Sequence, residues 1–141
     1  METKKWENHF GNAIYLSDSE EEITKKVMSA VTDPNRIKKD DLGNPDICMV
    51  AYYHKLFSSK EENDTVCSEC RAGQRGCVAC KKQLAKNIIE YLRPIREKRA
   101  YYELHPEEVD KILLEGTLKA QKVAKETMKK VKKAMKLDYF K

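Results

Sequence analysis

Five cysteines are the residues of this sequence whose type and spacing point most directly to chemistry. They are Cys48, Cys67, Cys70, Cys77 and Cys80. The last four follow the pattern C-x2-C-x6-C-x2-C, and Gly73 and Gly76 between the pairs let the chain fold tightly around an ion. A cluster of this kind is typical of a metal site rather than of unrelated buried thiols.

Two metal groups fit these cysteines. The first is Zn²⁺ held by four thiolates, for which two C-x-x-C pairs are the usual signature. The second is a [4Fe–4S] cluster held by four of the five cysteines. Six residues between the pairs is short for a zinc ribbon, and zinc would leave Cys48 unused. The residues alone leave both groups open.

The sequence shows no other legible reaction chemistry. It contains neither a G-x-x-x-x-G-K-[ST] nor a G-x-G-x-x-G motif, and no Ser/His/Asp set is recognisable among its three histidines. His54 is predicted to be a packed helix residue rather than a base. A free-standing enzyme is therefore the weakest interpretation of this chain.

Helical patterns dominate the elements that must position the cysteines. Overlapping S-x-x-E capping boxes, an Asn-Pro helix start and apolar residues at steps of three and four predict the helices. They span about residues 19–31, 45–57, 77–103 and 106–135. Residues 58–76 look irregular, and Pro94 should kink or break its helix. We expect an all-α fold, an irregular helical bundle of four to five helices with a cysteine-rich metal loop and no Rossmann domain.

The charge of the chain is unevenly distributed. Residues 81–141 carry 17 Lys and Arg against 9 Asp and Glu, a net charge of +8, whereas residues 1–80 have a net charge of −3. A basic half indicates an acidic partner such as nucleic acid, or else a solvated helix face rich in lysine. No apolar run is long enough to span a membrane and no secretory signal is visible, so a cytoplasmic protein without a membrane partner is expected.

Several blocks of the sequence resemble bacterial tryptophanyl-tRNA synthetases, in the order in which that family has them after its KMSKS loop. The blocks are residues 11–19 (GNAIYLSDS), 27–34 (VMSAVTDP), 53–57 (YHKLF), 76–85 (GCVACKKQLA), 94–99 (PIREKR) and 134–137 (AMKL). The resemblance covers about residues 11–140.

The resemblance implies the C-terminal helical, anticodon-binding region of tryptophan–tRNA ligase, a class I aminoacyl-tRNA synthetase. Residues 1–10 would be an N-terminal arm with a degenerate KMSKS-like segment, and residues 11–141 the helical anticodon-binding-like domain. Lys5 keeps the first lysine of that motif, but Asn8 replaces the second, which contacts ATP phosphates in the family. The sequence also shows no HIGH-type motif, so no adenylate formation is expected from this chain alone.

The resemblance also bears on the metal. A subset of the family has the pattern C-x22-C-x6-C-x2-C and carries a [4Fe–4S] cluster beside the anticodon-reading region. Here 21 residues separate Cys48 from Cys70, followed by six before Cys77 and two before Cys80. The resemblance thus implies these four as iron–sulfur ligands, with Cys67 as a bystander or substitute ligand and zinc as the alternative cofactor.

The implied partner is tRNA, specifically tRNA-Trp. Basic residues around the cysteines are the candidate RNA contacts. They are Arg71, Arg75, Lys81 and Lys82. Two alternatives stay open: a truncated paralogue acting as a regulatory or protein-interaction module, which would bind a full-length synthetase or another protein, and a zinc-stabilised RNA-binding protein.

Overall fold

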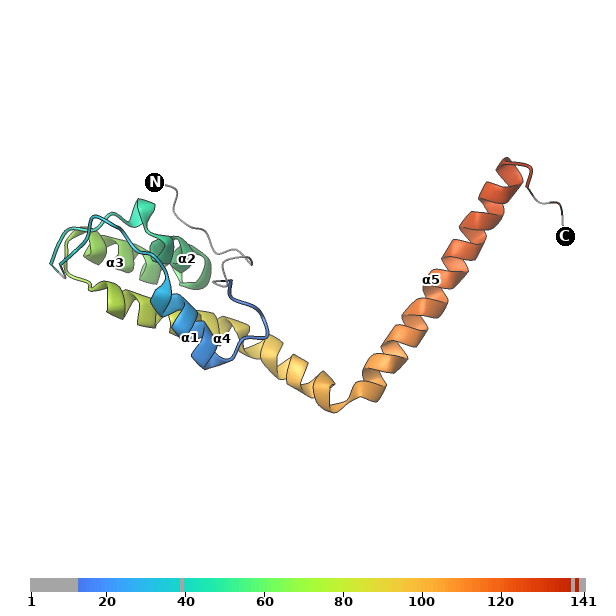
Figure 1. Cartoon of the computed structure of the whole chain (residues 1–141), viewed down its shortest axis with the longest axis horizontal. Coiled ribbons are helices and arrows are strands. Elements are labelled where there is room, and N and C mark those ends of the chain that lie inside the picture. Colours follow the sequence, from blue (N-terminus) through green and yellow to red (C-terminus); the bar gives the residue numbers. More distant parts are fainter. Residues whose placement is uncertain (1–12, 39, 138, 140–141) are drawn as a thin grey trace. The chain divides into compact units, whose positions relative to one another are not determined.

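The computed structural model describes residues 13–38, 40–137 and 139, and these residues form helices without a strand. The elements are α1 (Glu20–Ser29), the short 3-10 helix η2 (Pro45–Ile47), α2 (Met49–Phe57), α3 (Lys60–Arg71), α4 (Cys77–Leu104) and α5 (Pro106–Ala134) (Figure 1). The all-α prediction is confirmed. Lys5 and Asn8 of the KMSKS-like segment lie outside the described residues.

The chain divides into two compact units, Met1–Arg96 and Glu97–Lys141. The hydrophobic core lies in the first unit, where one face of α4 packs with α1 and α2. Its most buried side chains are Ile23 and Val27 of α1, Val50 and Ala51 of α2, and Leu84, Ala85 and Ile88 of α4. Ile23 and Val27 lie four residues apart, as do Leu84 and Ile88, which is the spacing of one helix face, and α1 and α4 lie where such spacing predicted helices.

Helix α1 begins at one of the predicted S-x-x-E capping boxes, formed by Ser19 and Glu22. Ser19 Oγ accepts a hydrogen bond from Glu22 N, and Glu22 Oε2 accepts one from Ser19 N. Two of the N–H groups that a helix start leaves unpaired are satisfied in this way. Near the other end of α1, Lys81 Nζ donates to Met28 O at 2.9 Å.

The prediction of an irregular stretch over residues 58–76 is wrong for α3. Ser59 is the N-cap of this helix and its side chain accepts from Glu62 N. The helix escapes prediction because only Val66 and Cys67 are buried, so it has no apolar stripe to recognise. The expected cysteine-rich loop is not confirmed, because the cysteines lie in or beside helices.

Two other predicted features differ in detail. The helix expected from residue 45 starts as the 3-10 turn η2, and α2 begins only after Cys48, whose backbone is extended. Pro94 lies inside α4 without ending it.

The second unit consists of the end of α4 and the 29-residue helix α5. All residues of α5 are described and none is buried. Within α5, a Cβ added at Gly116 would meet nothing within 4 Å. Among the described residues, no helix combines the length and apolar character needed to cross a membrane.

Candidate metal centre

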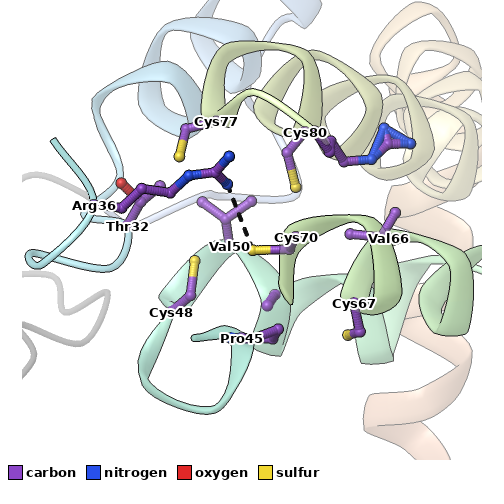
Figure 2. Close-up of a pocket in the computed structure, with 12 residues that line it drawn as sticks. Thr32, Arg36, Pro45, Cys48, Val50, Val66, Cys67, Cys70, Cys77 and Cys80 are labelled. Atoms are coloured by element: carbon purple, nitrogen blue, oxygen red, sulfur yellow. Dashed lines mark hydrogen bonds between the residues drawn. The ribbon is translucent and has the colours of Figure 1, made fainter. Parts of the chain in front are cut away.

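Four cysteines from three separate segments line one small cavity (Figure 2). Cys48 is the N-cap of α2, Cys70 lies in the last turn of α3, and Cys77 and Cys80 lie in the first turn of α4. The cavity has a volume of about 20 Å³. Figure 2 shows the Arg36 guanidinium lying among the sulfur atoms. The fold thus brings together all four cysteines that the resemblance implies as ligands.

Cys67 also borders this cavity, but its sulfur is turned away from the other four in Figure 2. It is buried, and its Sγ lies 3.9 Å from Asn63 Oδ1. The grouping of sulfurs therefore differs from the two consecutive C-x-x-C pairs that a zinc site would use.

In this conformation, the part of the chain that the structure describes contains no group of three or more His, Cys, Asp or Glu side chains arranged to hold a metal ion. The Arg36 side chain occupies the space between the sulfurs, and its Nη1 donates to Cys70 Sγ at 3.7 Å.

The loop before α2 forms a close cradle for Cys70. Gly43 N donates to Cys70 O at 2.9 Å, and a Cβ on Gly43 would lie 2.5 Å from Cys70 Sγ. Gly73 has a φ of 71°, and a Cβ there would lie 2.6 Å from Asp40 O. Both positions therefore require glycine, and Gly43 lets the backbone press directly against a candidate ligand.

In the metal-free chain, burial favours the neutral form of two thiols in this cavity. Burial raises the pKa of the Cys80 thiol to about 12 and also raises the pKa of Cys70. These two thiols are therefore protonated at neutral pH, and a metal would have to displace their protons in order to bind. Arg36 and Arg75 line the cavity, and no Asp or Glu is among its described lining residues. Soft thiolates with cations nearby suit zinc or an iron–sulfur group.

His54 is a further member of the site that sequence reasoning placed only as a packed helix residue. Its side chain is fully buried, and burial lowers its pKa, so the ring is neutral. Its Nε2 lies 3.2 Å from Cys80 O and 3.4 Å from Cys80 Sγ, and its Nδ1 lies 2.7 Å from Ser58 Oγ. No sequence motif identifies His54 or Arg36 as part of the site. His54 is 26 residues from Cys80 in the sequence, and Arg36 is 34 residues from Cys70.

Three of the four side chains predicted to contact RNA form ion pairs or hydrogen bonds with other residues of this chain. Arg71 pairs with Asp46 at 3.5 Å, Arg75 Nε pairs with Glu69 at 2.9 Å, and Lys81 donates to a backbone oxygen of α1. The Arg71 pair is exposed on both sides and is therefore weak enough to exchange for a phosphate.

The fourth, Lys82, lines an open groove of about 570 Å³ beside the cysteine site. The groove is also lined by Arg36, Ile37, Lys38, Cys77 and Val78. Sequence reasoning missed Arg36 and Lys38, which lie in the polar loop between α1 and η2.

Comparison with known proteins shows which family this chain matches. Residues 5–93 match the family described as tRNA synthetases class I (W and Y). The tryptophan–tRNA ligases of Aquifex aeolicus and Thermotoga maritima are 44% and 41% identical over 135 residues, which is 95% of this chain in each case. The crystal structure of tryptophanyl-tRNA synthetase from Campylobacter jejuni superposes with a TM-score of 0.82 at 26% identity, covering 93% of this chain.

The chain spans between about a third and two fifths of these proteins, namely 34% of the Aquifex ligase, 41% of the Thermotoga ligase and 42% of the Campylobacter structure. The family match covers well over half of the chain. The chain belongs to the class I tRNA synthetase family of the W and Y type.

Proposed function

We propose that this chain supplies the tRNA-binding, anticodon-side part of a tryptophan–tRNA ligase. The observation that carries the proposal is its identity of 44% to the Aquifex aeolicus ligase over 95% of the chain. We assign the chain itself no catalytic step, because the described site contains thiols and cations rather than groups that position ATP and an amino acid.

The groove beside the cysteine site supports an RNA ligand. Arg36, Lys38 and Lys82 supply cations that suit phosphates. Ile37 is 89% exposed and Val78 57% exposed, and apolar side chains at the same groove can pack against an unstacked base. Cations combined with exposed apolar surface favour a single-stranded loop of RNA over a regular duplex.

The test is binding of the chain to tRNA-Trp and to an unrelated tRNA, measured by fluorescence anisotropy at several salt concentrations. We expect tighter binding of tRNA-Trp. Lys38→Ala and Lys82→Ala should each weaken binding and reduce the salt slope by about one. Lys125→Ala on α5 is the control outside the groove. Equal affinity for both tRNAs would contradict the proposal.

We also propose that Cys48, Cys70, Cys77 and Cys80 hold a [4Fe–4S] cluster, with zinc as the alternative. Support comes from the shared cavity, its lack of described carboxylates and the Gly43 cradle around Cys70. Because the cavity is only about 20 Å³, loading a cluster requires the Arg36 guanidinium to move out. When bound, the group supplies a rigid cross-link between three helix ends.

Anaerobic purification with iron, sulfide and zinc analysis tests the metal. Iron and sulfide in equal amounts would support the cluster. Stoichiometric zinc without iron would contradict it and favour the alternative.

A second candidate function is a protein-interaction module, favoured by the exposed apolar residues of α5. Those that share one face of the helix include Ile112, Leu113, Val123 and Val131. A partner with an apolar groove and acidic edges would complement this stripe and the lysines beside it. Size-exclusion chromatography with the part of the Aquifex aeolicus ligase that this chain does not match tests it, and co-elution that is lost with Leu113→Lys would support it.

A further inference from the structure

We infer that His54 is a positioning residue for the sulfur of Cys80, and that a hydrogen-bond relay through Asn87 and Ser58 fixes its ring for this task. The hydrogen-bond relay is present in the metal-free chain. Its effect on a bound metal or iron–sulfur cluster rests on the proposed metal centre.

The relay starts from Asn87 of α4, whose orientation is determined by its partners. Asn87 Nδ2 lies 2.8 Å from Glu62 Oε2 and 2.8 Å from Ser58 Oγ, while Gln83 Nε2 donates to Asn87 Oδ1 at 3.2 Å. A carboxylate accepts only, so the amide nitrogen must face Glu62. Ser58 Oγ therefore accepts a hydrogen bond from Asn87.

The same logic fixes the histidine. Cys80 O, 3.2 Å from His54 Nε2, is a carbonyl that only accepts, and on this ground we place the ring hydrogen on Nε2. The neutral ring then has its lone pair on Nδ1, which accepts the hydroxyl hydrogen of Ser58 across 2.7 Å. Every donor in the chain from Asn87 through Ser58 to His54 has an acceptor, and the relay ends on Cys80.

The Nε2–H group at the end of the relay also reaches Cys80 Sγ, at 3.4 Å. A hydrogen bond to a ligating thiolate stabilises its negative charge and withdraws electron density from the metal group. Hydrogen bonds to the sulfurs are among the factors that set the reduction potential of an iron–sulfur group. Because His54 is fully buried, this hydrogen bond is made away from bulk water.

The first experiment is 15N NMR of the histidine rings in the metal-free chain. We expect the Nε2–H tautomer for His54, and a shift toward a mixture in Ser58→Ala. A dominant Nδ1–H tautomer in the unaltered chain would overturn the relay whatever metal the site takes.

The second experiment compares His54→Gln with His54→Phe after anaerobic reconstitution with ferrous iron and sulfide. Glutamine places an amide nitrogen near the position of Nε2, whereas phenylalanine keeps the ring and removes the donor. We expect His54→Phe to lower the midpoint potential and to lose iron to a chelator about tenfold faster, as for other groups that support metal ligands. His54→Gln should stay close to the unaltered chain.

The inference would be overturned if folded His54→Phe had the same midpoint potential and the same rate of iron loss as the unaltered chain. It would also be overturned if His54→Gln and His54→Phe lost iron equally fast. Circular dichroism establishes folding. If His54→Phe does not fold, the midpoint potential of Ser58→Ala is measured instead, because this variant keeps the imidazole. A Ser58→Ala potential equal to that of the unaltered chain would overturn the inference. A chain that takes up no iron would contradict the metal centre and the effect on it, while the NMR result would still test the relay.

Discussion

Gly43 is the residue at which one added methyl group would reach the cysteine site. A Cβ there would lie 2.5 Å from Cys70 Sγ. We expect Gly43→Ala to lower the free energy of unfolding by about 1–3 kcal/mol, the usual range for overpacking, and to weaken metal retention. Urea unfolding measures the first effect and iron content the second.

Gly116→Ala is the matched control, because open space surrounds this glycine inside α5. Alanine there should be neutral or should stabilise the helix by about 1 kcal/mol. A Gly43→Ala chain as stable as the unaltered protein would show that the loop yields without cost.

Cys67 and Cys70 lie three residues apart on α3 and should nonetheless behave differently. Cys70 shares the cavity with Cys77 and Cys80, whereas the sulfur of Cys67 is turned away (Figure 2). We expect Cys70→Ser to abolish iron retention and Cys67→Ser to preserve it, measured as iron per chain after anaerobic reconstitution. Loss of metal from Cys67→Ser as well would favour the two-pair zinc arrangement.

At the residue scale, local spacing predicted only part of the site. It identified the cysteine cluster, because its two C-x-x-C pairs are close in the sequence. It could not identify Arg36, Gly43 or His54, because their contacts with Cys70 and Cys80 depend on how the helices pack.

At the scale of elements, α1 should respond to acid through its capping box. Hydrogen bonds from the Ser19 backbone and side chain hold the pKa of Glu22 below its ordinary value of 4.5. A carboxyl group whose pKa is lower in the folded state stabilises the fold at pH values above its unfolded-state pKa. This stabilisation is lost as the pH falls through the folded-state pKa.

The midpoint of urea unfolding, measured from neutral pH down past pH 4.5, tests this dependence. We expect Glu22→Gln to show a shallower acid dependence than the unaltered chain, because it keeps an acceptor for the Ser19 N–H but cannot titrate. Identical acid dependence of the two proteins would contradict this role of Glu22.

The helices that could be predicted are those with a strong local signal. α1 starts with a capping box and α5 with a helix-start proline, and α1, α4 and α5 all carry apolar residues at steps of three and four. α3 offers only Val66 and Cys67 as buried positions, so tertiary packing rather than periodicity reveals it. The start of α2 was predicted too early because Asn44 and Pro45 open the 3-10 turn η2 instead.

At the scale of the whole molecule, the two units should differ in stability. The first contains a core in which Ile23, Leu84 and Ile88 are almost completely buried, while α5 has no buried residue. Most helical stability in proteins comes from packing rather than from propensity. Hydrogen exchange followed by mass spectrometry should therefore show strong protection of residues 84–92 and weak protection of residues 112–131.

Strong protection of α5 would mean that its apolar stripe is covered in solution. Repeating the exchange at several protein concentrations separates the causes, because protection that grows with concentration indicates a second copy of the chain as the cover.

Hydrogen bonds to one side chain hold together the two ends of the loop between α1 and α2. Asp33 is buried, its Oδ1 accepts from Asn35 N at 2.9 Å, and its Oδ2 accepts from Asn44 N at 2.8 Å. One carboxylate thus ties together the two ends of the segment that carries Arg36 and Lys38. A loop whose two ends are held together in this way loses less conformational entropy when Arg36 and Lys38 engage a ligand than a loop with free ends would.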